Sequence, residues 1–67
     1  METKWIKIFS SPKVALAEII KAMLIENDIE AVSLNKQDSS YLYGEIEIFV
    51  KSTDVIMAKQ LILKHNS

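Results

Sequence analysis

The chain has 67 residues, with eight lysines, nine acidic residues, no arginine, no cysteine and a formal net charge of −1. Without cysteine it cannot form disulfides or thiolate metal centres, and without an arginine-bearing basic stripe it lacks the usual signature of a nucleic-acid binder. A chain this short buries only about 60% of the surface that its unfolded form exposes. Its hydrophobic fraction of 49% is high for that size. Either the core is dense or a second subunit covers part of the apolar surface; we expect both, and hence a homodimer.

Membrane insertion and secretion are also disfavoured. The sequence has no run of about 18 apolar residues, and its N-terminus lacks the apolar core of a signal peptide. We expect a soluble, cytoplasmic protein in which residues 1–67 form a single domain.

The first predicted element is a strand over residues 4–9. Apolar residues alternate in this stretch (KWIKIF), which is the period-two pattern of a half-buried strand. Ile6 and Ile8 then share one face, and Trp5 and Phe9 share the other.

A helix is predicted next, from Pro12 to Asn27. Ser11 is a favourable N-cap, and Pro12 suits the first helical position, where its missing N–H costs nothing. Asn27 tolerates the left-handed conformation that often ends a helix. The apolar stripe of this helix recurs at three- and four-residue spacing and consists of Leu16, Ile19, Ile20, Met23 and Leu24.

Residues 30–34 (EAVSL) predict a second strand, with Val32 and Leu34 on its buried side. The residues that follow have no period up to Gly44, the only glycine in the chain. We therefore expect a loop over residues 35–44, longer than a tight hairpin requires.

Residues 44–51 (GEIEIFVK) carry the clearest strand pattern in the chain. The β-branched residues Ile46, Ile48 and Val50 alternate with two glutamates, Phe49 and Lys51, and suit a packed sheet face. Phe49 lies on the opposite face, beside two glutamates.

A second helix is predicted to follow Ser52, Thr53 and Asp54, which are N-cap candidates, and to end near Lys64. Its apolar stripe consists of Val55, Ala58, Leu61 and Ile62.

The predicted order of elements is β-α-β-β-α, an α+β fold. The right-handed crossover rule places the third strand between the first two, which gives a three-stranded antiparallel sheet of order 1-3-2. Both helices then cover one face, as in a ferredoxin-like (PII-like) sandwich that lacks its fourth strand. The sheet residues expected under the helices are Ile6, Ile8, Val32, Leu34, Ile46, Ile48 and Val50.

The uncovered face of the sheet is the candidate binding surface. Trp5, Phe9 and Phe49 are expected there, with Tyr41 and Tyr43 on the adjoining loop. Contiguous exposed apolar surface usually marks a partner site, for a second copy, another protein or a small effector. Two structural alternatives stay open: a twisted sheet can wrap Trp5 and Phe9 into the core, and the tyrosines can clasp the sheet edge. RNA-binding sheets also stack bases on aromatic rings, but the glutamates beside Phe49 would repel phosphates.

Residues that could carry catalysis are few, and we expect no enzyme activity. His65, the only histidine, lies near the C-terminus without the support that a general base needs. Glu45 and Glu47 lie two apart on one strand face, which is typical of a solvated strand. Asp38 could join them around a divalent cation, but no ligand loop repeats the spacing of such sites. One glycine cannot build a phosphate-binding loop, so we expect no bound nucleotide. We likewise expect no metal and no other cofactor.

Several stretches together carry a resemblance to a known family. They are the WIKIFSSP opening, the GEIEIFV strand, and the positions Ala17, Leu24, Ile29, Ala31, Val32, Ala58 and Leu61. The chain resembles the prokaryotic signal-transducing protein family, whose members are short bacterial domains with a PII-like, ferredoxin-like fold. The resemblance implies a role in signalling, although fold alone is a poor guide to function.

The chain departs from the family pattern in two respects. Relatives often carry a glycine at the end of the first helix, where this chain has Asn27 and Asp28. The cysteine-rich metal-binding tail of some relatives is absent, so the resemblance implies no zinc. PII proteins bind nucleotides through a long loop and glycine-bearing segments that this chain lacks, so no nucleotide site is carried over.

Two functional hypotheses follow. The first is a regulatory or adaptor module, acting as a homodimer, that presents the uncovered sheet face and the 35–44 loop to a protein or small effector. The alternative is a small-molecule sensor whose 35–44 loop becomes ordered on binding.

Overall fold

The computed structural model describes residues 4–36 and 44–65. β3 lies between β1 and β2 and runs antiparallel to both. The α+β class, the antiparallel pairing and the strand order 1-3-2 are thereby confirmed. The elements are β1 (Trp5–Ser11), α1 (Val14–Glu26), β2 (Ala31–Asn35), β3 (Ile46–Lys51) and α2 (Val55–His65), with a 3-10 turn at Ser52–Asp54 before α2.

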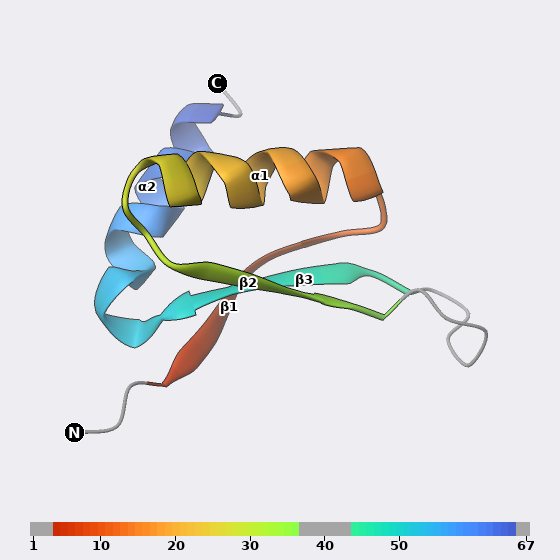
Figure 1. Cartoon of the computed structure of the whole chain (residues 1–67), viewed down its shortest axis with the longest axis horizontal. Coiled ribbons are helices and arrows are strands. Elements are labelled where there is room, and N and C mark those ends of the chain that lie inside the picture. Colours follow the sequence, from red (N-terminus) through yellow and green to blue (C-terminus); the bar gives the residue numbers. More distant parts are fainter. Residues whose placement is uncertain (1–3, 37–43, 66–67) are drawn as a thin grey trace.

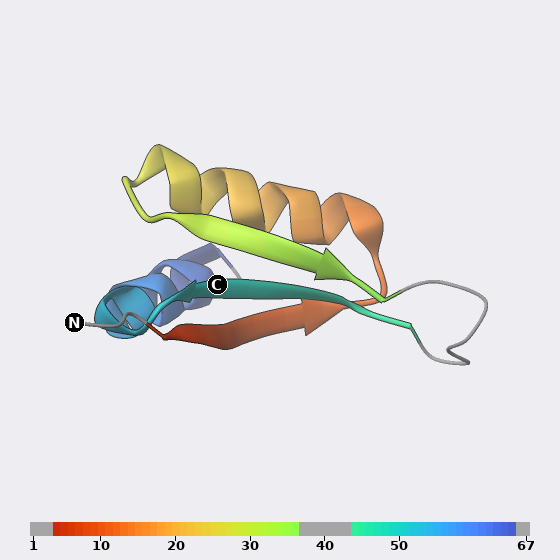
Figure 2. The ribbon, with the colours of Figure 1, turned by 60° about the horizontal axis from the view of Figure 1, so that its bottom comes forward.

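Both helices lie on one side of the sheet (Figures 1 and 2). α1 runs along the strands and contacts all three of them, whereas α2 crosses behind the C-terminal end of α1 and contacts β1 and β3 (Figure 1). Within the part of the chain that the structure describes, no element covers the reverse side of the sheet. This arrangement leaves one sheet face for the candidate site.

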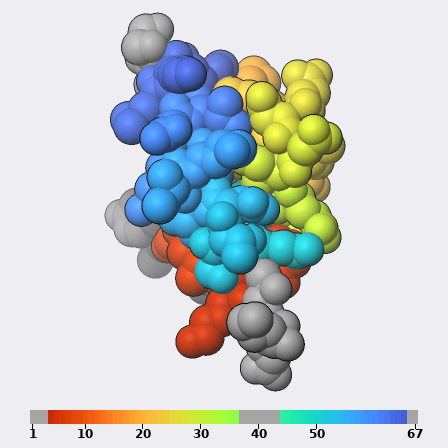
Figure 3. Space-filling view, turned by 90° about the vertical axis from the view of Figure 1, so that its left-hand side faces the viewer, coloured from red at the N-terminus to blue at the C-terminus, as the bar shows by residue number. Residues whose placement is uncertain are grey.

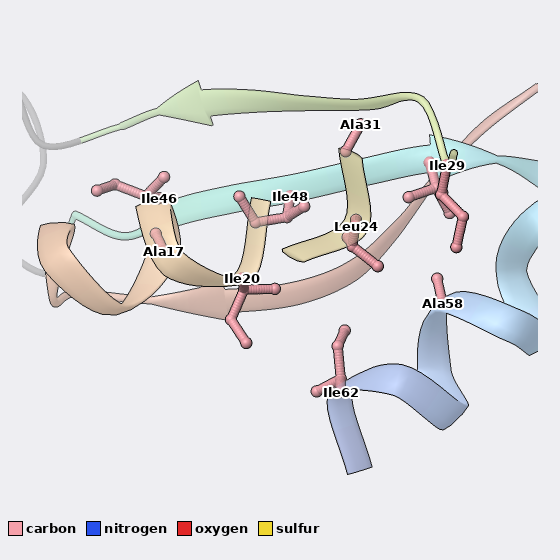
Figure 4. Close-up of a cluster of buried hydrophobic side chains, with 10 residues drawn as sticks. Ala17, Ile20, Leu24, Ile29, Ala31, Ile46, Ile48, Ala58 and Ile62 are labelled. Carbon is pink, nitrogen blue, oxygen red and sulfur yellow. The ribbon is translucent and has the colours of Figure 1, made fainter. Parts of the chain in front are cut away.

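The core lies between the sheet and the two helices (Figure 4). β3 provides its centre, because Ile46, Ile48 and Val50 point toward the helices and are at most 3% exposed. This face of β3 is as predicted. The helices, the α1–β2 connection and β2 add Ala17, Ile20, Leu24, Ile29, Ala31, Ala58 and Ile62 to the core.

α1 ends in a Schellman motif. The backbone N–H of Ile29 donates to the carbonyl of Leu24 at 2.9 Å, and that of Asp28 donates to the carbonyl of Ile25 at 3.0 Å. The left-handed residue is Asp28, with φ of 64°, so the prediction of Asn27 for this position was wrong by one residue. Ile29 folds back onto α1 as expected and is buried.

The start of α1 also differs from the prediction. Ser11 still belongs to β1 and is buried, so α1 begins only at Val14. The Oγ of Ser11 accepts a hydrogen bond from the backbone N–H of Lys13 at 3.1 Å, which stabilises the turn before the helix rather than the helix itself. Along α1, Ile19 is 52% exposed, because the stripe that faces the sheet includes Ala17 instead.

β2 has the opposite phase from the one predicted. Val32 and Leu34 lie on the uncovered face, whereas Ala31 is buried under α1. α1 and β2 are in contact, and the Nζ of Lys21 on α1 donates to the Oγ of Ser33 at 3.5 Å. The small side chains of Ala31 and Ser33 therefore face the helix, and the larger aliphatic ones are excluded from this narrow space.

A β-bulge in β1 overturns the predicted position of Phe9. The register with β3 shifts between Lys7 and Phe9, so Ile8 is an extra residue that changes the alternation of the strand. Phe9 then lies opposite the buried Ile48 and packs against the core together with Ile8. It belongs to the helix side of the sheet. Ile6, before the bulge, is on the helix side as predicted but stays 38% exposed.

Candidate functional site

The face of the sheet that points away from the helices, called the open face below, is built from all three strands. Residues that pair directly across an antiparallel ladder share a face, so the register defines its members. Figure 2 shows the strands from a direction closer to this face. The open face consists of Trp5, Lys7 and Ser10 from β1, Val32 and Leu34 from β2, Glu47, Phe49 and Lys51 from β3, and the flanking residues Glu30, Lys36 and Glu45.

An apolar band crosses the open face from β1 to β2. Phe49 is half-buried near its middle, with Lys7 opposite on one side and Val32 opposite on the other. Trp5 is the diagonal neighbour of Phe49, within reach of a long side chain. Trp5, Val32 and Leu34 are 42%, 41% and 48% exposed. Large apolar side chains are thus exposed to solvent next to one another, which is a property of interaction surfaces.

Ion pairs lie around this band. Glu47 accepts from the Nζ of Lys7 at 3.4 Å through one oxygen and pairs with the Nζ of Lys36 at 3.3 Å through the other. Lys51 pairs with Glu30 at 3.0 Å. When Glu45, which precedes β3, is included, the open face carries three lysines and three glutamates. The open face therefore has no formal net charge, unlike a surface built for a strongly charged partner.

The pKa of Glu47 is perturbed by its surroundings on the open face. Partial burial raises the pKa of its carboxyl, but hydrogen bonds and charges from Lys36 and Lys7 outweigh burial and hold the pKa below its usual value. Glu47 is therefore ionised at neutral pH. A general acid or base that works near neutral pH needs a carboxyl pKa that is raised, not lowered.

The structure brings together only some of the predicted site residues. Trp5 and Phe49 share the open face, and Phe9 does not, because of the bulge. Tyr41 and Tyr43 lie outside the described residues. The sequence prediction missed Val32 and Leu34, which supply half of the apolar band.

One feature of the sequence could have placed those two residues correctly. In the AVSL stretch, small residues alternate with large aliphatic ones. A helix that packs closely on a strand leaves room for the small residues only, so the large ones belong on the other face.

Metal ligation finds no support in the described residues. Across residues 4–36 and 44–65, no three histidine or acidic side chains come together as a metal site would require. Asp38, which the sequence offered as a third ligand beside Glu45 and Glu47, lies outside this part of the chain. In the same part, no helix combines the length and apolar character needed to cross a membrane.

Comparison with known proteins gives one result. No curated protein and no solved structure matches the chain. A family model matches residues 5–65 and carries the description "Putative prokaryotic signal transducing protein". The match extends from the first residue of β1 to the last residue of α2, so it includes the whole sheet and both helices. The chain belongs to the family that this model describes.

Proposed function

We propose that this chain is a non-enzymatic regulatory module that works in signal transduction by binding protein through its open face. The observation that carries the proposal is the exposed apolar band of Trp5, Val32, Leu34 and Phe49. Membership of a signal-transducing family supports a regulatory role. The low pKa of Glu47 supports binding over acid–base catalysis, because the carboxylate is held ionised by two lysines.

The occupant of the open face is a second copy of the chain. Two identical faces can meet across a two-fold axis without net repulsion, because the lysines and glutamates of the open face balance. A standard interface buries about 800 Å² per partner, which is about one sixth of the 4974 Å² that the chain exposes. Burial on that scale compensates for the small core of a 67-residue chain.

Sedimentation velocity tests this dimer. The wild-type chain is expected to sediment as a dimer at micromolar concentrations. Val32→Glu places a charge within the apolar band, next to Phe49, and is expected to give monomers. Because Val32 is exposed in the single chain, the variant should keep its far-ultraviolet circular dichroism.

Ile19→Glu is the matched control. Ile19 is an exposed aliphatic residue of similar accessibility on α1, away from the open face. This variant should remain a dimer. A wild-type chain that is monomeric at high micromolar concentration, or a Val32→Glu variant that dimerises as tightly as wild type, would contradict the proposal.

A further inference from the structure

A second apolar site lies on the opposite side of the sheet from the open face, between β1 and α2. Ile8 of β1 and Lys59, Ile62 and Leu63 of α2 line a pocket of about 260 Å³. Its lining is almost entirely apolar, and Leu63 at its border is 69% exposed. Figure 3 looks onto the outer side of α2, with β1 in red below it. This volume suits a single large side chain and is below the usual range for a drug-sized ligand.

The bulge explains why the pocket has an apolar floor. As the extra residue of β1, Ile8 turns toward the helices instead of the open face. α2 crosses the sheet instead of running along β1 (Figure 1). The pocket lies between these two elements, with Ile8 on the β1 side and Ile62 and Leu63 on the α2 side.

The outer edge of β1 borders this pocket. In the part of the chain that the structure describes, β1 pairs with β3 alone. The carbonyl of Lys4 accepts a hydrogen bond from the backbone N–H of Ser52 at 2.8 Å, so the backbone polar groups of Lys4 point toward the β3 side. These groups alternate in direction along an antiparallel strand, so the backbone N–H and C=O groups of Trp5 and Lys7 point away from β3, to the free edge. A complete split β-α-β sheet would place a fourth strand at this edge.

The charged side chain that lines the pocket is basic. Lys59 lines it, and neither β1 nor α2 contains an acidic residue. The lysine of β1, Lys7, points to the open face and pairs with Glu47 there. A segment that brings a carboxylate to the pocket would therefore be attracted by Lys59.

We propose that the edge of β1 and the α2 pocket bind an extended, acidic peptide segment of a partner protein. The segment pairs with β1 as a fourth strand, and one of its large aliphatic side chains enters the pocket formed by Ile8, Ile62 and Leu63. A carboxylate of the segment lies next to Lys59. Main-chain pairing supplies affinity in such strand addition, and the side-chain pocket supplies specificity. This site is separate from the open face, so one dimer could carry two such peptides.

Selection from a phage-displayed library of random octapeptides tests the proposal. The recovered peptides should carry aspartate or glutamate together with aliphatic residues at alternate positions. A synthetic peptide of the recovered sequence should shift the backbone amide resonances of Trp5 and Lys7. Leu63→Glu should weaken its binding by about tenfold or more, and Lys59→Glu should abolish the preference for acidic peptides.

Matched variants separate this site from the open face. Val14→Glu changes an exposed residue at the far end of α1 and should leave peptide binding unchanged. Val32→Glu should also bind peptide normally, even as a monomer. Recovery of no peptide, recovery of basic peptides, or equal binding by Leu63→Glu would overturn the proposal. So would binding to phosphatidylserine vesicles that Leu63→Glu abolishes while no peptide is recovered, because the surface would then recognise lipid.

Discussion

At the scale of single residues, Asp28 has a backbone conformation that is unfavourable for a residue with a side chain. Its φ of 64° lies in the left-handed region, which is unfavourable by about 1 kcal/mol for a residue with a Cβ. Asp28→Gly should therefore raise the free energy of unfolding by about 0.5–1 kcal/mol. Urea unfolding followed by circular dichroism measures the change.

Asn27 is the control for this prediction. It precedes the left-handed residue, has an ordinary φ of −99°, and donates from its side chain to the Met23 carbonyl at 2.8 Å. Asn27→Gly should lower the stability, because it removes that hydrogen bond and adds chain entropy to the unfolded state. Equal effects of the two glycine variants would contradict this account of the helix end.

Glu47 makes the stability of the chain depend on pH. Its folded pKa is lowered, so the stabilisation by Lys7 and Lys36 is complete above the unfolded pKa and is lost as the pH falls through the folded pKa. Glu47→Gln should be less stable than wild type at neutral pH, and the difference should vanish in strong acid. Urea unfolding over a pH series measures this convergence.

The double variant Lys7→Met and Lys36→Met checks the cause. It removes both cations and leaves the carboxyl of Glu47 in place. The rise of the free energy of unfolding with pH that is assigned to Glu47 should then flatten. If it stays as steep as in wild type, the lysines are not the source of the lowered pKa.

At the scale of elements, periodicity predicted the order and type of every strand and helix but not the face of each strand. β3 was placed correctly, because its apolar residues are all large and β-branched on one side. The prediction gave β2 the wrong phase, because the size of the side chains, and not their hydrophobicity, decides which face of β2 packs against α1. Phe9 was misplaced because a bulge interrupts the alternation of β1. Both errors arise from tertiary packing, which the alternation of apolar and polar residues does not predict.

The size limit under α1 leads to a prediction for β2. Ala31 is 7% exposed and packs in the core. Ala31→Leu should destabilise the chain by about 1–3 kcal/mol, because the extra carbons have no free space between β2 and α1. Thermal unfolding measures the loss. Val32→Leu, on the neighbouring open-face position, should change stability much less; an equal loss would show that α1 does not limit the size of side chains on β2.

At the scale of the whole molecule, a sheet covered by helices on one side leaves the reverse side to a partner. The strand order and the two helices on one side were predictable from the sequence, and so was the presence of Trp5 and Phe49 on the reverse side. The full extent of the apolar band was not predicted, because alternation of apolar and polar residues does not give the phase of β2; side-chain size in the AVSL stretch does, and it places Val32 and Leu34 in the band. The correction strengthens the proposed interface, since two aliphatic residues of β2 replace one aromatic residue of β1.

Trp5 allows a direct measurement of that interface. It is the only tryptophan in the chain and lies on the open face, 42% exposed in the single chain. We expect its emission to shift to shorter wavelength, and its quenching by acrylamide to fall, as the concentration rises through the dimerisation range found by sedimentation. A dimer that forms while Trp5 emission and quenching stay constant would place the interface elsewhere and contradict the open-face account.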